Sequence, residues 1–381
     1  MSDEKVYKDF LDWLGKTWWQ LTDSEYLLPL IKANYAPEEA ELLTGMPFSV
    51  KTLDELADMK DMDSAELEPR LKEMAKKGMI FESKRGDSVL YRLNDSFFAM
   101  MRANLWPGLE DERTKTTAPL INKYFLDGWF DQYADVHHKG LRALPIDKTI
   151  EDSREILPFE DILKVIEDRD YYSVSTCPCR HRHNLDPDMP DCKHPTEVCL
   201  HFDELGHYVV DNDQGREITK EETFEILKKA ADAGLVHGIT NFKEKPDTIC
   251  NCCNCCCMWF EAYYKLDHDR SMDASNYKVE VNPDTCKGCA LCVKRCHMDA
   301  LQLQVHNKAP NKYHKAAVLV DPDLCIGCGV CVHKCPSDSL TLVRNQEITE
   351  PPKDVREYGR LFMADRLAAR EKSEGEAGKE E

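Results

Sequence analysis

The alternation of apolar and polar positions over residues 1–110 predicts a small helical domain that ends in a hairpin. A helix is expected near residues 24–34, and two more follow, with Thr52 at the start of one and Gly78 at the end of the other. Two strand-like stretches, 79–83 and 88–93, are then separated by a polar turn. The pattern therefore predicts helices followed by a two-stranded hairpin.

The middle of the chain predicts fewer regular elements. Residues 111–170 carry prolines between helical stretches, one of them 159–166, and are expected to form a connector without chemistry of its own. Residues 171–175 predict a short buried strand. A capping box predicts a helix that begins at Thr219, and an aromatic-rich helix is expected over 258–266.

An internal repeat of about 39 residues, from Cys286 to Cys325, dominates residues 278–344. Valines precede each copy and leucines follow it at matching offsets, so each half predicts strand, loop, helix and strand. Residues 345–365 predict one more helix, and the charged residues 371–381 predict a disordered tail.

The length of 381 residues suggests several domains. The predicted fold class is α+β multidomain, with an N-terminal helical domain, a central cysteine-rich α/β domain and a C-terminal domain built on the repeat. The expected boundaries are 1–110, 111–170 (connector), 171–277, 278–344, and 345–381 (helix and tail).

The net charge of −20 does not change the predicted fold, but it argues against one class of function. Residues 278–344 carry +3 (9 basic minus 6 acidic), and all other blocks are acidic. An acidic surface argues against nucleic acid, which needs a basic footprint. The opening MSDEKVYKDF is not a signal peptide, and no run of about 20 apolar residues is present. A cytoplasmic protein with reduced thiols is therefore expected, although export on a signal-bearing partner stays open.

Eight of the eighteen cysteines form two copies of one motif, C-x2-C-x2-C-x3-C. Three thiolates on one tight loop can bind three corners of an iron–sulfur cube, while the fourth ligates the other cluster. A zinc ribbon would separate two C-x2-C pairs and lack the third cysteine, and cysteines three residues apart on one loop do not favour disulfides. The spacing therefore indicates iron–sulfur clusters.

This block resembles the bacterial two-[4Fe-4S] ferredoxin domain. The resemblance implies one cluster on Cys286, Cys289, Cys292 and Cys335, and a second on Cys325, Cys328, Cys331 and Cys296. Gly288 and Gly327 are expected to let the backbone curl close to each cluster, so that amide N–H groups bond its sulfurs. There are two departures: His297 replaces the usual proline after Cys296, and the polar, basic insert 307–315 is a candidate contact surface.

Ten further cysteines lie upstream, and six of them fall within eight residues, which would be an oxidation hazard without a metal. Ten thiolates hold two four-cysteine clusters with two to spare, or one unusual cluster plus redox-active thiols. We expect the separate groups to meet in space. The ten are Cys177, Cys179, Cys192, Cys199, Cys250, Cys252, Cys253, Cys255, Cys256 and Cys257.

The arrangement C-x-C-R … C-N-C-C-x-C-C-C resembles the central part of poorly characterised ferredoxin-type proteins of anaerobic bacteria, over residues 140–344. Arg180 either offsets cluster charge or is an ordinary surface arginine. Each of four nearby histidines is weighed as a further ligand, with a structural role favoured: His181, His183, His194 and His201.

The N-terminal domain resembles a winged helix, as in small bacterial regulators. DNA binding is one implication, but the second helix begins with Asp63, Glu66 and Glu68 and contains Pro69, which is a poor face for phosphates. We therefore favour a docking module, including homo- or hetero-oligomer contacts through this domain.

The sequence contains no GxGxxG after a strand, P-loop, HExxH or GxSxG, so no nucleotide, flavin or catalytic residue is assigned. The leading hypothesis is an iron–sulfur electron carrier, or a subunit of an oxidoreductase complex, with two [4Fe-4S] clusters and one or two central clusters. Its partners would be redox proteins, such as an oxidoreductase or flavoprotein. The alternatives are a reductase with a catalytic central cluster acting on a disulfide or thiol, and a redox-sensing regulator that uses Lys84, Arg85 and Arg92.

Overall fold

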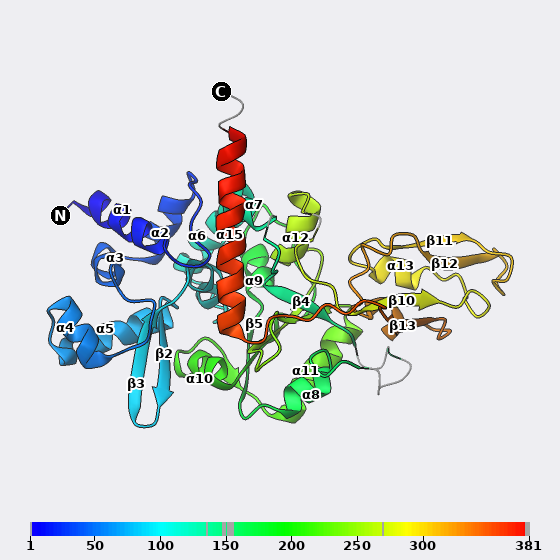
Figure 1. Ribbon diagram of the computed structural model, residues 1–381, viewed down its shortest axis with the longest axis horizontal. Coiled ribbons are helices and arrows are strands. Elements are labelled where there is room, and N and C mark those ends of the chain that lie inside the picture. Colours follow the sequence, from blue (N-terminus) through cyan, green and yellow to red (C-terminus); the bar gives the residue numbers. More distant parts are fainter. Residues whose placement is uncertain (1, 135, 147–149, 151–155, 269, 378–381) are drawn as a thin grey trace.

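The computed structural model describes residues 2–134, 136–146, 150, 156–268 and 270–377. The chain is elongated: a helical part lies at one end, a six-stranded sheet lies in the middle, and a small part built from short strands lies at the other end (Figure 1). The long C-terminal helix stands between the two ends.

The N-terminal part contains the helices and the hairpin that the sequence predicts. Thr52 caps its helix, because its Oγ1 accepts from Glu55 N at 3.3 Å and Glu55 Oε2 accepts from Thr52 N at 2.9 Å. Gly78 ends the next helix at φ +80°. A short strand joins the hairpin in the order β1-β3-β2. The elements are α1 (Asp3–Leu14), α2 (Leu27–Asn34), α3 (Pro37–Leu43), β1 (Lys51–Thr52), α4 (Leu53–Lys60), α5 (Ser64–Lys76), β2 (Ile80–Arg85) and β3 (Ser88–Leu93).

Residues 98–134 form helices packed in the core. Trp129, Phe130 and Tyr133 are fully buried among other aromatic side chains. Residues 112–134 contain helical segments, as expected for this part of the chain, and burial of these aromatic rings outweighs the proline in mid-helix at Pro119. The elements are η1 (Phe98–Ala103), α6 (Glu112–Tyr124), η2 (Phe125–Trp129) and α7 (Asp131–Ala134).

An antiparallel sheet with strand order β4-β8-β9-β6-β5-β7 forms the centre. The predicted strand at 171–175 and the helices at 219 and 258 are present, and Thr219 Oγ1 accepts from Glu222 N at 3.1 Å. The helix expected over 159–166 begins at Ile162. The elements are β4 (Leu141–Leu144), α8 (Ile162–Glu167), β5 (Tyr172–Thr176), α9 (Pro178–Leu185), β6 (Glu197–Phe202), α10 (Asp203–Asp211), β7 (Arg216–Glu217), α11 (Lys220–Asp232), β8 (Val236–Thr240), β9 (Thr248–Cys252) and α12 (Met258–Lys265).

The repeat folds as strand, loop, helix and strand in each half, as predicted. The two halves interlock, because the first strand of one half pairs with the last strand of the other, and the two inner strands pair together. The elements are β10 (Tyr277–Val281), α13 (Leu291–Arg295), β11 (Leu301–Val305), β12 (Lys315–Leu319), α14 (Val330–His333) and β13 (Leu340–Arg344).

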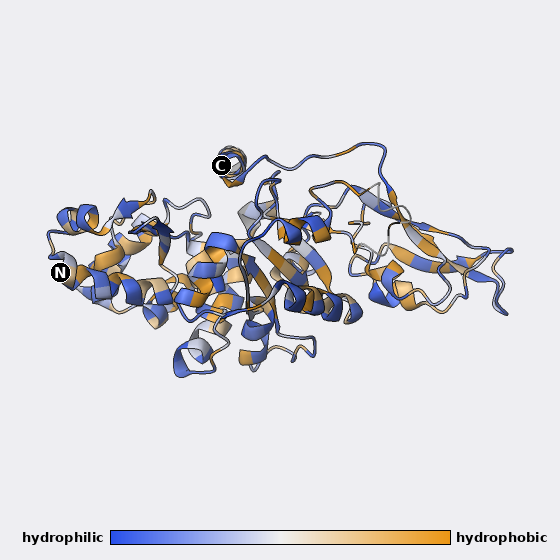
Figure 2. Ribbon diagram, turned by 90° about the horizontal axis from the view of Figure 1, so that it is seen from below, coloured by the Kyte–Doolittle hydropathy of each residue, from blue (hydrophilic) through white to orange (hydrophobic). Residues whose placement is uncertain are grey.

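The chain then returns across the molecule as an extended segment to α15 (Val355–Ala377) (Figure 2). The predicted helix therefore begins ten residues later than expected, and it continues to Ala377 through most of the tail predicted to be disordered; residues 378–381 lie outside the described part. Arg366 Nη2 donates to Trp19 O at 2.9 Å, which ties α15 to the N-terminal part. Among the described helices, none combines the length and hydrophobicity that a bilayer crossing requires.

Candidate metal centres

The eight cysteines of the repeat gather around two separate pockets. Cys286, Cys289, Cys292 and Cys335 line the first, which we call the outer pocket. Cys296, Cys325, Cys328 and Cys331 line the second, the inner pocket. The structure therefore brings together the two sets that the resemblance groups, with one cysteine exchanged between the halves.

Both predicted glycines stand where the backbone requires them. Gly288 and Gly327 have φ of +64° and +63°, which L side chains rarely adopt. A Cβ on Gly288 would lie 2.7 Å from Lys315 O, and one on Gly327 would overlap Tyr277 O. Both glycines therefore pack closely against neighbouring carbonyl groups, and Gly327 also lines the inner pocket.

The outer pocket faces solvent beneath a basic loop. Cys289 is exposed, and every residue that lines this pocket belongs to the repeat. The insert 307–315 lies beside it, since Asn311 Nδ2 donates to Cys286 O at 3.1 Å. Lys287 lines this pocket, and the insert carries three more lysines: Lys308, Lys312 and Lys315.

The inner pocket is bound to the central sheet. Ile146 N donates to Cys328 O at 3.3 Å. Arg295 Nη2 donates to Ala231 O at 2.9 Å, and His297 Nε2 lies 2.6 Å from Gly234 O. His297 therefore holds the loop after Cys296 against the end of α11.

The ten central cysteines divide into sets of four and six. Four sulfurs lie within 4.8 Å of one another, those of Cys192, Cys253, Cys255 and Cys256. We call this the four-cysteine site. Cys192 comes from the loop before β6 and the other three from the loop between β9 and α12, so the expected convergence of distant cysteines is confirmed.

The other six cysteines surround one cavity, which we call the six-cysteine cavity. It lies where the ends of β5, β6 and β9 meet the start of α12, and Cys253 also reaches its wall. Phe97, Arg102 and Trp106 close it from the N-terminal side, and Trp259 from α12. The six are Cys177, Cys179, Cys199, Cys250, Cys252 and Cys257.

Sequence reasoning missed these closing residues. Arg102 is a single charge within the apolar run from Phe97 to Trp106. A charge in such a run needs a buried partner, so the position of Arg102 could have predicted a buried polar site nearby. Its guanidinium packs over the rings of Phe97 and Trp106 and faces the thiols of Cys199 and Cys250.

Contact among the thiols separates their pKa values. Burial opposes ionisation of Cys257, but hydrogen bonds from the thiols of Cys179 and Cys252 lower its pKa to about 6. The pKa of the Cys177 thiol is shifted in the opposite direction, because its contact with Cys179 and its burial raise it well above the usual range. Some thiols are therefore ready as thiolate ligands, and the others would lose their protons to solvent when a metal binds.

Arg180 is fully buried between the two sets, so the surface-arginine alternative is wrong. Its guanidinium donates to Asn251 O at 2.5 Å and Pro195 O at 2.9 Å. Burial lowers its pKa, but the charges of Cys177 and Cys253 outweigh burial and raise it.

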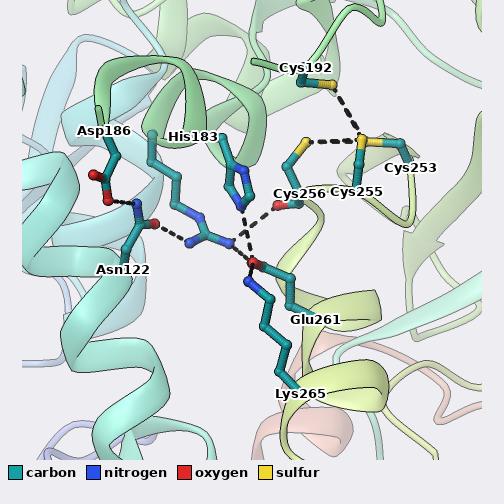
Figure 3. Close-up of polar contacts among 10 residues, drawn as sticks. Asn122, His183, Asp186, Cys192, Cys253, Cys255, Cys256, Glu261 and Lys265 are labelled. Carbon is teal, nitrogen blue, oxygen red and sulfur yellow. Dashed lines mark hydrogen bonds and ion pairs between the residues drawn. The ribbon is translucent and has the colours of Figure 1, made fainter. Parts of the chain in front are cut away.

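A buried charge network supports the four-cysteine loop (Figure 3). Arg182 bonds to Glu261 and Asn122, and its Nη2 also donates to Cys256 O at 3.2 Å. Glu261 further accepts from Lys265 at 2.6 Å and lies 3.0 Å from His183 Nε2. Burial raises the pKa of Glu261, but these cations outweigh it and lower the pKa to about 2.

The four histidines weighed as ligands have different surroundings. His183 belongs to the charge network, and His181 Nε2 lies 2.8 Å from Leu109 O. His201 is buried with its ring centroid 4.3 Å from that of Trp106, and neither ring nitrogen has a hydrogen-bond partner among the described residues. Burial lowers the pKa of His194, which lies near Cys253.

The two pockets and the cysteine pattern around them define the class: this is an iron–sulfur protein whose C-terminal part is a ferredoxin-type domain. Residues 285–339 match a family model described as a 4Fe-4S dicluster domain, and residues 317–372 match a second model with the same description. Searches of curated proteins and of solved structures gave no significant match.

The buried His237 on β8 makes the central sheet sensitive to acid. Its Nδ1 lies 2.6 Å from Oδ1 of Asn251, the residue between Cys250 and Cys252. Burial lowers the pKa of His237 to about 4, against 6.5 for an ordinary histidine. The unfolded chain therefore takes up its proton first as pH falls. The contribution of His237 to the free energy of unfolding is expected to be constant above pH 6.5 and to drop by about 3 kcal/mol between pH 6.5 and 4.

Anaerobic urea unfolding of wild type and His237→Gln at pH 7, 5.5 and 4 measures this effect. The variant should lose less stability than wild type over the same interval. Equal losses in both proteins would contradict the assignment.

Proposed function

We propose that this protein relays single electrons between redox partners through two [4Fe-4S] clusters and at least one further centre, in an anaerobic cytoplasm where thiols stay reduced. The outer cluster is held by the cysteines of the outer pocket and the inner cluster by those of the inner pocket. The observation that carries the proposal is the sorting of eight cysteines around two pockets, four to each, in the sets that cubane ligation needs.

The positions of the pockets give an order to the relay. The outer pocket opens to solvent at Cys289, whereas the inner pocket is bonded to the central sheet through Cys328 and Arg295. Electrons therefore exchange with a partner at the outer cluster and pass through the inner cluster to the central cysteines. Gly288 and Gly327 keep the backbone close to both clusters.

The basic loop beside the outer pocket favours an acidic redox partner, either an oxidoreductase or a flavoprotein. The domain that carries this loop is positive, while the rest of the chain is negative. Complementary charge speeds the encounter of two proteins and orients them. Lys287 and the insert 307–315 are placed where they would face such a partner.

The further centre is an iron–sulfur cluster in the six-cysteine cavity. Thiolates are the usual cluster ligands, and an apolar wall with few charges is typical of cluster sites. The residues present fit this donor set, with Arg102 and Arg180 on two sides to offset the negative charge of thiolates and sulfides. When bound, the cluster would store and release one electron.

The test is the metal content of protein purified without oxygen, together with EPR during a redox titration. About twelve irons and twelve sulfides per chain are expected from three four-iron clusters. About eight of each would confine iron to the repeat and overturn the central cluster. A Cys328→Ala variant should block reduction of the central centre by a donor that still reduces the outer cluster.

A second candidate function, reduction of a substrate at the central centre, is supported by a neighbouring cavity. A cavity of about 550 Å³ lies between the N-terminal part, the sheet and α15, and shares Phe97, Arg102 and Trp259 with the six-cysteine cavity. This volume suits a small organic molecule. A cubane needs four thiolates, so two of the six thiols are spare for chemistry on a disulfide or thiol.

The N-terminal part, in our proposal, is a winged-helix-like docking module and not a DNA reader. Tyr208 of α10 donates to Ala75 O at 2.7 Å, and Lys84 of the hairpin pairs with Asp211 at 2.8 Å. The end of α5 and one wing lysine are thus already engaged by the central part, which argues against the redox-sensing regulator.

A further inference from the structure

The four sulfurs of the four-cysteine site lie close to one another. Cys253 and Cys256 lie 3.2 Å apart, and Cys192 lies 3.5 Å from Cys255 and 4.0 Å from Cys253. Cys255 lies 3.9 Å from Cys256. Among the residues that the structure describes, this is the one group of three or more Cys, His, Asp or Glu residues whose ligand atoms all lie within 4.8 Å of one another.

These separations fit one tetrahedral ion. With a metal–sulfur bond of about 2.3 Å, the sulfurs of a tetrahedron lie about 3.8 Å apart. In a cubane each cysteine sulfur binds a different iron at a corner and points outward, so four ligands must stand farther apart around the cluster. Among the described residues, only the four-cysteine site has three or more cysteine sulfurs that all lie within 4.8 Å of one another, whereas the thiols of the six-cysteine cavity contact one another in pairs around its wall.

We propose that Cys192, Cys253, Cys255 and Cys256 bind a single Zn²⁺ or Fe²⁺ ion and not an iron–sulfur cluster. Cys253 and Cys256 have the C-x2-C spacing common in zinc sites, and tetrahedral sulfur coordination suits both ions. On binding, four thiols release four protons to solvent and form four metal–sulfur bonds. The site then carries a charge of −2, which the buried Arg180 beside it partly offsets.

The ion would fix the contact between the central sheet and the ferredoxin-type domain. Cys192, Cys253 and Cys256 pack with Ala230 and Leu235 around the end of α11. The neighbouring carbonyls of Ala231 and Gly234 accept hydrogen bonds from Arg295 and His297, which flank Cys296 of the inner pocket. A structural ion at this position therefore holds the inner cluster's loop in place.

The wild-type full chain, purified without oxygen, provides the first test. The expected result is one zinc per chain with equal iron and sulfide, or no zinc and one iron in excess of sulfide. X-ray absorption identifies the zinc case by four sulfur neighbours at about 2.3 Å without a metal–metal vector. A high-spin ferric EPR signal after oxidation identifies the iron case. Absence of zinc with equal iron and sulfide would overturn the proposal.

Two matched variants locate the ion. Cys192→Ser is expected to lose the single ion and keep its sulfide content, whereas Cys177→Ser, at the six-cysteine cavity, keeps the ion. A Cys192→Ser protein that loses sulfide together with metal would show a cluster there instead. If this variant fails to fold, the wild-type stoichiometry and spectra decide alone. The outcome is independent of the number of clusters elsewhere in the chain.

Discussion

Replacing Gly327 with alanine is expected to abolish the inner cluster and to destabilise the ferredoxin-type domain. At φ +63° a side chain adds strain of about 1–2 kcal/mol. Its Cβ would also overlap Tyr277 O, a backbone atom of β10 that cannot turn aside, and the Ser275 hydroxyl. Overpacking of this kind adds about 1–3 kcal/mol. Iron content should fall by about four per chain, measured with sulfide and EPR on anaerobic protein.

Two other glycines serve as controls for this prediction. Gly86, in the hairpin turn, has φ +60° but nothing within 4 Å of an added Cβ. Gly86→Ala should therefore cost only the backbone strain and keep all iron. Gly288→Ala should remove the outer cluster and leave the inner one. Full iron content in Gly327→Ala would show that the loop can rearrange and that the glycine is not required there.

Glu261→Gln is expected to lower the free energy of unfolding by about 3 kcal/mol or more. Glu261 is the shared anion of Arg182, His183 and Lys265, and its carboxylate is almost completely buried. The amide keeps the shape but leaves a buried arginine without its counter-charge, and breaking a buried pair in this way costs about 3–5 kcal/mol. Anaerobic urea unfolding at pH 7 measures the change in midpoint.

The matched control is Glu350→Gln. Glu350 pairs with Lys243 at 2.5 Å, but its side chain is 63% exposed, so loss of this pair should cost less than about 1 kcal/mol. Because Arg182 also donates to Cys256 O, Glu261→Gln should in addition lower the metal occupancy of the four-cysteine site. Equal stabilities of the two variants would contradict a structural role for the buried network.

Local signals predicted much of the fold and the ferredoxin-type domain. Thr52 and Gly78 stand at helix ends in the structure, as their residue types predict. The cysteine motif and the repeat could likewise be recognised from residues that lie close together in the sequence. The packing of residues 112–134 into the core was not predicted, because it depends on contacts between residues far apart in the sequence. Pro119 signals a break locally, but the burial of Trp129 and Tyr133 against distant aromatic rings makes this region part of the core.

The division of the central cysteines was not predictable from spacing. Cys199 meets Cys250 because β6 lies between β9 and β5 in the sheet, and that strand order is set by long-range pairing. Likewise, Cys192 reaches Cys255 across 63 residues of sequence. Six cysteines in eight residues predict metal, but only the fold shows that the closely spaced run serves two different sets.

The chain enters and leaves the ferredoxin-type domain at one point. Tyr277 pairs with Arg344, and just outside this pair Asn345 N donates to Asn276 O at 2.8 Å. The host fold is completed only afterwards, when α15 returns to cover Trp19. The dicluster domain is therefore an insertion within the host fold, which also holds it through the contacts of Arg295 and His297 with the end of α11. Truncation after residue 276 removes a piece of the host as well.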